Sequence, residues 1–65
     1  MIYKVEIERE DDGRWIAEIV DIPGVIAYGA TPEAAQARVR QLATAVLAER
    51  RERGEAIPEE ILIVA

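Results

Sequence analysis

Apolar and polar side chains alternate along the start of the chain, as they do in a β-strand with one buried face. Residues 2–8 predict a first strand, and residues 15–20 predict a second. Between them, Asp11-Asp12-Gly13 is typical of a tight turn, because aspartate side chains bond to nearby backbone and glycine accepts a positive φ. The two strands are therefore expected to form an antiparallel hairpin.

The length of this turn decides which side chains share a face of the hairpin. A loop of three residues, 11–13, places Ile7 opposite Ala17 and makes one face apolar throughout. A loop of two residues would place Ile7 opposite Glu18 and mix the faces. We therefore expect the longer loop, with Trp15 at the rim of the apolar inner face. The outer face would then carry Lys4, Glu6, Glu8, Ile16, Glu18 and Val20.

The dipeptide Pro23-Gly24 follows the second strand and predicts a type II turn. Proline fixes φ at the first central position of such a turn, and glycine supplies the positive φ of the second. A third strand at residues 25–28 would complete an antiparallel meander. A ligand-binding loop is the alternative for Pro23 and Gly24, but a corner between strands is the commoner use of this dipeptide.

A helix is expected to begin at Thr31-Pro32-Glu33, with threonine as N-cap, proline in the first turn and glutamate near the positive end of the helix dipole. The helical pattern continues through Ala48 and an arginine-rich end to Gly54, which is a typical C-terminal stop. The apolar stripe is expected to contain Ala35, Val39, Leu42 and Val46, widened by Ala43 and Leu47.

The continuously apolar residues 61–64 predict a fourth strand. The order β-β-β-α-β indicates an α+β fold in which the fourth strand lies parallel to the first, through a right-handed crossover. We expect a four-stranded sheet in the order 3-2-1-4, with one helix on one face. Residues 1–65 would form a single domain.

The composition narrows the functions that this fold could have. The sequence contains neither cysteine nor histidine, which excludes disulfides, the usual zinc sites and imidazole catalysis. We expect no enzyme activity, no cofactor and no bound metal. A net charge of -5 argues against direct contact with nucleic acid and favours a basic protein partner. No segment has the apolar length of a signal peptide or a membrane span, so we expect a cytoplasmic protein.

The outer face of the predicted sheet lies opposite the helix and is half acidic and half aliphatic. This mixture favours a partner interface over a solvated surface. The expected partner-binding residues are Glu6, Glu8, Ile16, Glu18 and Val20. The fourth strand would add either Ile61 and Ile63 or Leu62 and Val64 to this face. Its uncharged edge also invites pairing with a second copy, through Ile61, Leu62, Ile63 and Val64.

The carboxylates of the outer face have three possible roles. Glu6 falls opposite Glu18, and like charges in this position repel each other. The side chains could extend into water, bind lysine or arginine of a partner, or hold a divalent metal for a hydrolase. The metal site is the weakest of the three, because the sheet offers no converging cage of aspartate or asparagine.

Several short motifs occur in an order that resembles the HicB family of antitoxins. These are the opening Tyr3-x-Val5-x-Ile7, the turn "DDG" followed by Trp15, and then "DIPGV", "YGATPEAA" and "GEAIPEE". The similarity spans residues 3–60. Two positions depart from the family pattern, since Val20 and Val25 stand where members often have proline and cysteine.

The resemblance implies a partial RNase H-like fold and an inhibitory function. Antitoxins of this family bind a small basic ribonuclease of the HicA type and cover its active site. Members often continue into a C-terminal DNA-binding domain, so this chain would be a short form without one, and we expect no direct operator binding. The alternative is a solitary homo-oligomeric structural or regulatory protein with no toxin partner.

Overall fold

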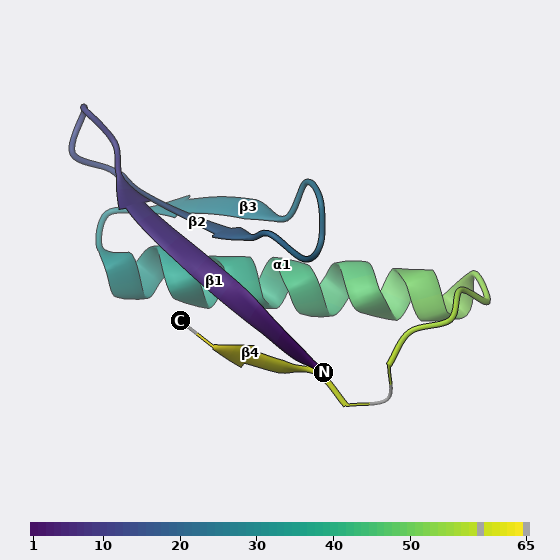
Figure 1. The fold of residues 1–65 in the computed structure, drawn as a ribbon. Helices are drawn as coiled ribbons and strands as arrows, with labels where there is room; N and C mark the ends of the chain where they lie inside the picture. The colour runs from purple at the N-terminus through teal and green to yellow at the C-terminus, as the bar shows by residue number, and fades with distance from the viewer. Residues whose placement is uncertain (59, 65) are drawn as a thin grey trace.

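The strands of the protein form one mixed sheet, and a single long helix lies across one face of it (Figure 1). The computed structural model describes residues 1–58 and 60–64. Its elements in chain order are β1 (Ile2–Arg9), β2 (Trp15–Ile19), β3 (Ile26–Gly29), α1 (Pro32–Glu52) and β4 (Leu62–Val64). The sheet order is β3-β2-β1-β4, with β4 parallel to β1 and the other neighbours antiparallel. The α+β fold and the sheet order predicted from the sequence are confirmed.

The β1-β2 hairpin has the expected three-residue loop. The backbone N–H of Glu10 donates to the Arg14 carbonyl at 2.7 Å, and Gly13 has a φ of 91°. Val5 lies opposite Ile19, and Ile7 lies opposite Ala17. The apolar side chains of both strands therefore share the inner face, as the alternating pattern predicts.

The connection from β2 to β3 consists of two successive turns. The Ile22 N–H donates to the Ile19 carbonyl at 3.0 Å, and the Val25 N–H donates to the Ile22 carbonyl at 3.2 Å. Pro23-Gly24 is the corner of the second turn, with a φ of 85° at Gly24. Because the first turn begins at Ile19, the predicted extension of β2 to Val20 is wrong, and β3 begins one residue later than expected.

The two ends of α1 have the expected caps. Thr31 Oγ1 accepts a hydrogen bond from the Ala34 N–H at 3.1 Å, and Pro32 is the first helical residue. At the other end, Gly54 has a φ of 81° and its N–H donates to the Arg51 carbonyl, while the Glu55 N–H donates to the Arg50 carbonyl. This pair of bonds is a Schellman cap, and it ends the helix where the sequence predicts.

Replacing Thr31 by alanine is expected to lower the free energy of unfolding by about 1 kcal/mol, because the Ala34 N–H loses its acceptor. Urea unfolding followed by circular dichroism measures the change. Thr44→Ala is the matched control, since the Thr44 hydroxyl donates to the Arg40 carbonyl in the middle of the exposed helix surface. A loss at Thr44 as large as that at Thr31 would contradict the capping role.

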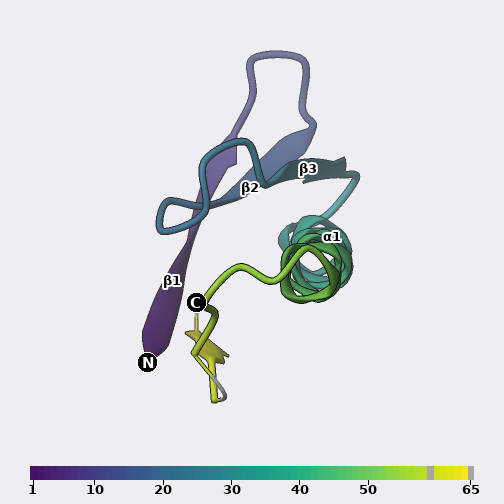
Figure 2. The same ribbon diagram turned by 90° about the vertical axis from the view of Figure 1, so that its right-hand side faces the viewer.

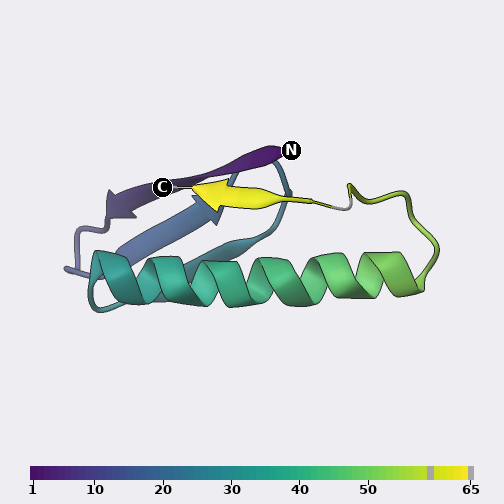
Figure 3. The ribbon, with the colours of Figure 1, turned by 90° about the horizontal axis from the view of Figure 1, so that it is seen from below.

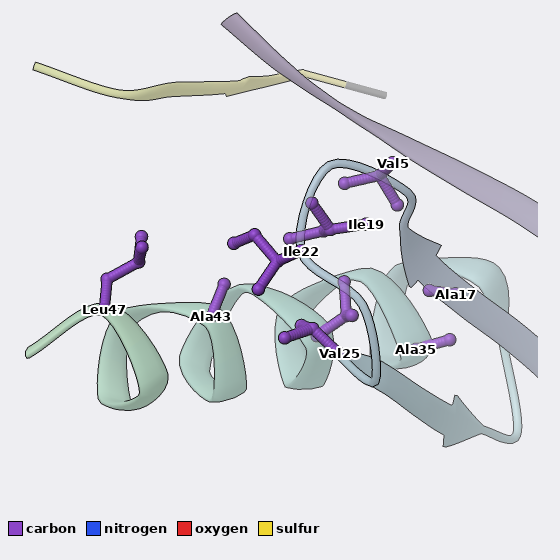
Figure 4. Packing of buried hydrophobic residues seen from close by; sticks show 9 residues of the cluster. Val5, Ala17, Ile19, Ile22, Val25, Ala35, Ala43 and Leu47 are labelled. Carbon is purple, nitrogen blue, oxygen red and sulfur yellow. The ribbon is translucent and has the colours of Figure 1, made fainter. Parts of the chain in front are cut away.

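The hydrophobic core fills the space between α1 and the inner face of β1 and β2 (Figure 4). Ile22 and Val25, from the β2-β3 connection, are as deeply buried as the strand residues. On α1 the buried residues recur every four positions, and Leu42 is 37% exposed, so its predicted place in the buried stripe is wrong. The core consists of Val5, Ala17, Ile19, Ile22, Val25, Ala35, Val39, Ala43 and Leu47.

The helix covers the sheet unequally. A view along α1 shows it beneath β2 and β3, with β4 to one side (Figure 2). Seen from below, β4 lies at the near edge of the sheet, alongside β1 (Figure 3). A groove of about 220 Å³ separates α1 from β4 and is lined by Thr44, Leu47, Arg51, Ile61 and Ile63. Within residues 1–58 and 60–64, no helix has the length and apolar character needed to cross a membrane.

Candidate partner-binding face

The face of the sheet opposite α1 is built from alternate residues of all the strands. The parallel pairing of β1 with β4 places Ile2 beside Leu62 and Lys4 beside Val64. Because side chains of neighbouring residues in register point to the same side of a sheet, Leu62 and Val64 lie on the outer face. Ile63 pairs with Tyr3 and packs against the core from the inner side. The structure thus decides between the two alternatives for β4.

The centre of the outer face is acidic. Glu6 lies directly opposite Glu18, and Glu8 lies opposite Ile16. Antiparallel neighbours in this position have Cβ atoms about 5 Å apart, so the two carboxylates share one small region of the surface. They line an open groove of about 380 Å³, together with Lys4, Val5, Ile7, Glu8 and Ile16.

The carboxylates of this groove are not neutralised by nearby cations. In the part of the chain that the structure describes, Glu6, Glu8 and Glu18 form no salt bridge. Lys4 is the groove's basic residue, so its side chains carry a net negative charge. Glu6 and Glu8 are exposed and Glu18 is half-buried. The groove therefore presents two exposed carboxylates and the half-buried Glu18, with no competing ion pair among the described residues.

Apolar side chains flank the acidic centre on both sides. On one side, β3 adds Ile26 opposite Glu18 and Tyr28 opposite Ile16, and both are exposed. Sequence reasoning missed these two residues, although the expected third strand placed them at alternate positions. On the other side, the flank is formed by Ile2, Leu62 and Val64. The outer face thus has an acidic stripe between two apolar borders.

Arg14 contacts both Tyr28 of the apolar border and Asp12 of the hairpin turn. Its guanidinium lies over the Tyr28 ring, 4.8 Å from the centroid, and its Nε donates to Asp12 Oδ2 at 2.7 Å. The backbone N–H of Arg14 also donates to Asp12 and is the main reason why the pKa of that carboxyl lies below its usual value. Arg14 is therefore held at the rim and does not neutralise the acidic stripe.

Val20, one of the expected partner-binding residues, lies off the sheet. It belongs to the turn after β2 and is 52% exposed. Because β2 ends before Val20, the Lys4 backbone N–H bonds to a side chain and not to a residue of β2. Its acceptor is Asp21 Oδ2, at 3.1 Å. The other expected residues, Glu6, Glu8, Ile16 and Glu18, are brought together around one groove.

The groove has the composition of a binding surface for a cationic side chain. Among the residues that the structure describes, no group of three acidic side chains converges as a metal site would require. Two carboxylates bordered by aliphatic side chains suit the charged head and the apolar stem of lysine or arginine.

Replacing Glu6 by glutamine is expected to raise the free energy of unfolding by a few tenths of a kcal/mol, because it removes the like-charge pair with Glu18. Urea unfolding at low ionic strength measures this gain, which should shrink as salt screens the repulsion. Glu8→Gln is the control, since Glu8 lies opposite the uncharged Ile16. Equal effects at both positions would contradict a specific Glu6-Glu18 repulsion.

Comparisons of the chain with protein-family models, with curated proteins and with solved structures found no match.

Proposed function

We propose that this chain is an inhibitory binding protein that covers the active site of a small basic ribonuclease with the outer face of its sheet. The observation that carries the proposal is the Glu6-Glu18 pair, in an open groove bordered by exposed apolar side chains. A folded chain that keeps two like charges opposite each other gives up stability. A cation of the partner would compensate for that cost in the complex.

The resemblance to HicB antitoxins supplies the class of partner in this proposal. A HicA-type ribonuclease is small and basic, as required of a partner for a chain with a net charge of -5. The β-β-β-α-β arrangement agrees with the partial RNase H-like fold that the resemblance implies. We place the complex in the cytoplasm, where RNA is the target of the partner, and expect the antitoxin-like chain itself to make no contact with nucleic acid.

In this proposal the chain binds and does not catalyse a reaction. The side chains that line its groove are carboxylates, one lysine and aliphatic residues. These groups recognise a basic surface by charge and by apolar contact, and they need no cofactor or metal to do so.

An RNA cleavage assay tests the proposed function. The protein encoded in the neighbouring reading frame, which this proposal expects to be small and basic, is incubated with RNA and with increasing amounts of this chain. We expect cleavage to stop when the chain reaches a stoichiometric ratio to the ribonuclease. Undiminished cleavage at a large excess of the chain, together with no heat of binding by calorimetry, would contradict the proposal.

A further inference from the structure

The two edges of the sheet differ in whether a side chain bonds to their backbone. Just before β3, the Ile19 N–H donates to the Val25 carbonyl at 3.1 Å, so Val25 belongs to a hydrogen-bonded pair with the β2 residue Ile19. Since such pairs alternate in an antiparallel ladder, the backbone groups of Ile26 and Tyr28 face the free edge. One of them is occupied, because Arg38 Nη1 donates to the Tyr28 carbonyl at 2.8 Å. Arg38 thus caps one backbone acceptor of the β3 edge.

The β4 edge carries no such cap in the described residues. The Leu62 N–H donates to the Met1 carbonyl at 2.9 Å, so the backbone of Leu62 and Val64 is directed to β1. Backbone groups of successive strand residues point to opposite sides, which leaves the N–H and carbonyl of Ile63 on the free side of the sheet. Charged side chains, which often protect such edges, are absent from residues 61–64.

We propose that β4 pairs with β4 of a second copy of this chain, antiparallel and about a two-fold axis at Ile63. In this arrangement the two Ile63 residues exchange both of their free backbone hydrogen bonds, which makes the edge self-complementary. Leu62 of each copy lies opposite Val64 of the other on the outer face. The two sheets then form one continuous eight-stranded sheet, since each contributes four strands.

The self-complementary, uncharged edge favours a second copy as its occupant, whereas charge opposes the stacking of two outer faces. Face-to-face stacking would bring Glu6, Glu8 and Glu18 of one chain against the same residues of another, at a net charge of -5 per chain. Edge pairing instead joins the uncharged stretches. It also adds apolar surface beside the groove between α1 and β4, where Ile61 and Ile63 are only partly buried by their own chain.

The paired arrangement leaves both acidic grooves accessible. Antiparallel strands related by a two-fold axis perpendicular to the sheet present the same face on the same side. The two Glu6-Glu18 pairs therefore lie on one surface of the dimer, and both helices lie on the other. A dimer of this kind has two equivalent binding grooves.

Sedimentation velocity of the chain alone, over a series of micromolar concentrations, tests this dimer. We expect the wild-type chain to sediment as a dimer. Ile63→Pro removes the free N–H of each copy without removing a bond to β1, and Leu62→Lys places an exposed charge beside the pairing strand. Each variant should raise the dissociation constant by about tenfold or more.

Ile26→Lys is the matched control, because it places the same charge on the exposed outer face of the opposite edge strand. It should leave the dimer intact, and circular dichroism should show that all three variants are folded. A monomeric wild-type chain would overturn the proposal. So would a dimer that persists in both β4 variants, or one that Ile26→Lys dissociates.

Discussion

The double variant Glu6→Lys/Glu18→Lys is expected to bind the proposed partner, a basic ribonuclease, at least about a hundredfold more weakly than the wild-type chain. The two carboxylates lie opposite each other on the outer face, and no residue described in the structure neutralises them by a salt bridge. Two lysines in their place would oppose cations of the partner. Association should become slower, and the remaining binding should depend less on salt.

The matched control for this variant is Glu33→Lys/Glu52→Lys, which changes the net charge equally. Both control positions are exposed and lie on α1, away from the outer face. Titration calorimetry at low and moderate ionic strength should show nearly wild-type affinity for the control. If both double variants lose affinity to the same degree, the total charge of the chain and not the Glu6-Glu18 pair governs binding, which would contradict the proposed interface.

The largest effect on folding is expected from Gly29→Ala. A Cβ atom at Gly29 would lie 2.5 Å from the Ala35 backbone nitrogen and 2.9 Å from the Ala34 carbonyl carbon. Backbone atoms at the start of α1 cannot move aside as the end of a flexible side chain can. We expect the free energy of unfolding to fall by about 3 kcal/mol, which is a large part of the stability of a small domain.

Gly24→Ala separates this steric effect from the general cost of replacing a glycine. Gly24 has a φ of 85°, but a Cβ atom there would meet no heavy atom within 4 Å. Its replacement should cost about 1 kcal/mol, from backbone strain alone. Urea unfolding compares the two variants. Equal losses at Gly24 and Gly29 would contradict the close approach of β3 and α1.

The Glu6-Glu18 pair affects both the stability of the free chain and the proposed binding of a basic partner. Glu6→Gln is expected to stabilise the free chain slightly, whereas charge reversal of the same position together with Glu18 is expected to abolish tight binding. Both effects have the same physical cause, which is a concentration of negative charge held in place by the register of β1 and β2. The free chain keeps the repulsion between Glu6 and Glu18, which is destabilising. In the proposed complex, a cation of the partner would relieve it.

Much of the fold followed from the sequence because local signals agreed with one another. The alternation in residues 2–8 and the parity of the Asp11-Asp12-Gly13 turn were sufficient to predict the β1-β2 register. That register then placed Glu6 opposite Glu18. The strong caps at Thr31 and Gly54 likewise defined the helix, because their hydrogen bonds involve only neighbouring residues.

The features that the sequence did not reveal depend on contacts between distant elements. Leu42 has helical spacing suited to the core, but α1 lies beneath β2 and β3 in an orientation that centres Val39 and Ala43 instead. Ile22 is buried because two turns, and not one, connect β2 to β3. The face of Ile63 depended on the parallel register with β1, which four consecutive apolar residues cannot specify.

Part of the candidate site could be predicted from the sequence, because local signals determine the register of the β1-β2 hairpin. Glu6, Glu8, Ile16 and Glu18 belong to a hairpin whose register is encoded locally, and the structure gathers them around one groove. Val20 was wrongly placed because the hydrogen bond from Ile22 to Ile19 ends β2 before it. Ile26 and Tyr28 were missed because their face follows from the pairing of β3 with β2 across the double turn.

Mapping the surface of the chain that the proposed ribonuclease partner covers tests the binding face most directly. Methyl resonances of the isotopically labelled chain can be followed by nuclear magnetic resonance as the ribonuclease is added. We expect shifts for Ile16 and Ile26 on the outer face, and none for Ala37 and Ala45 on the exposed side of α1. Shifts confined to α1, with unchanged Ile16 and Ile26, would contradict it.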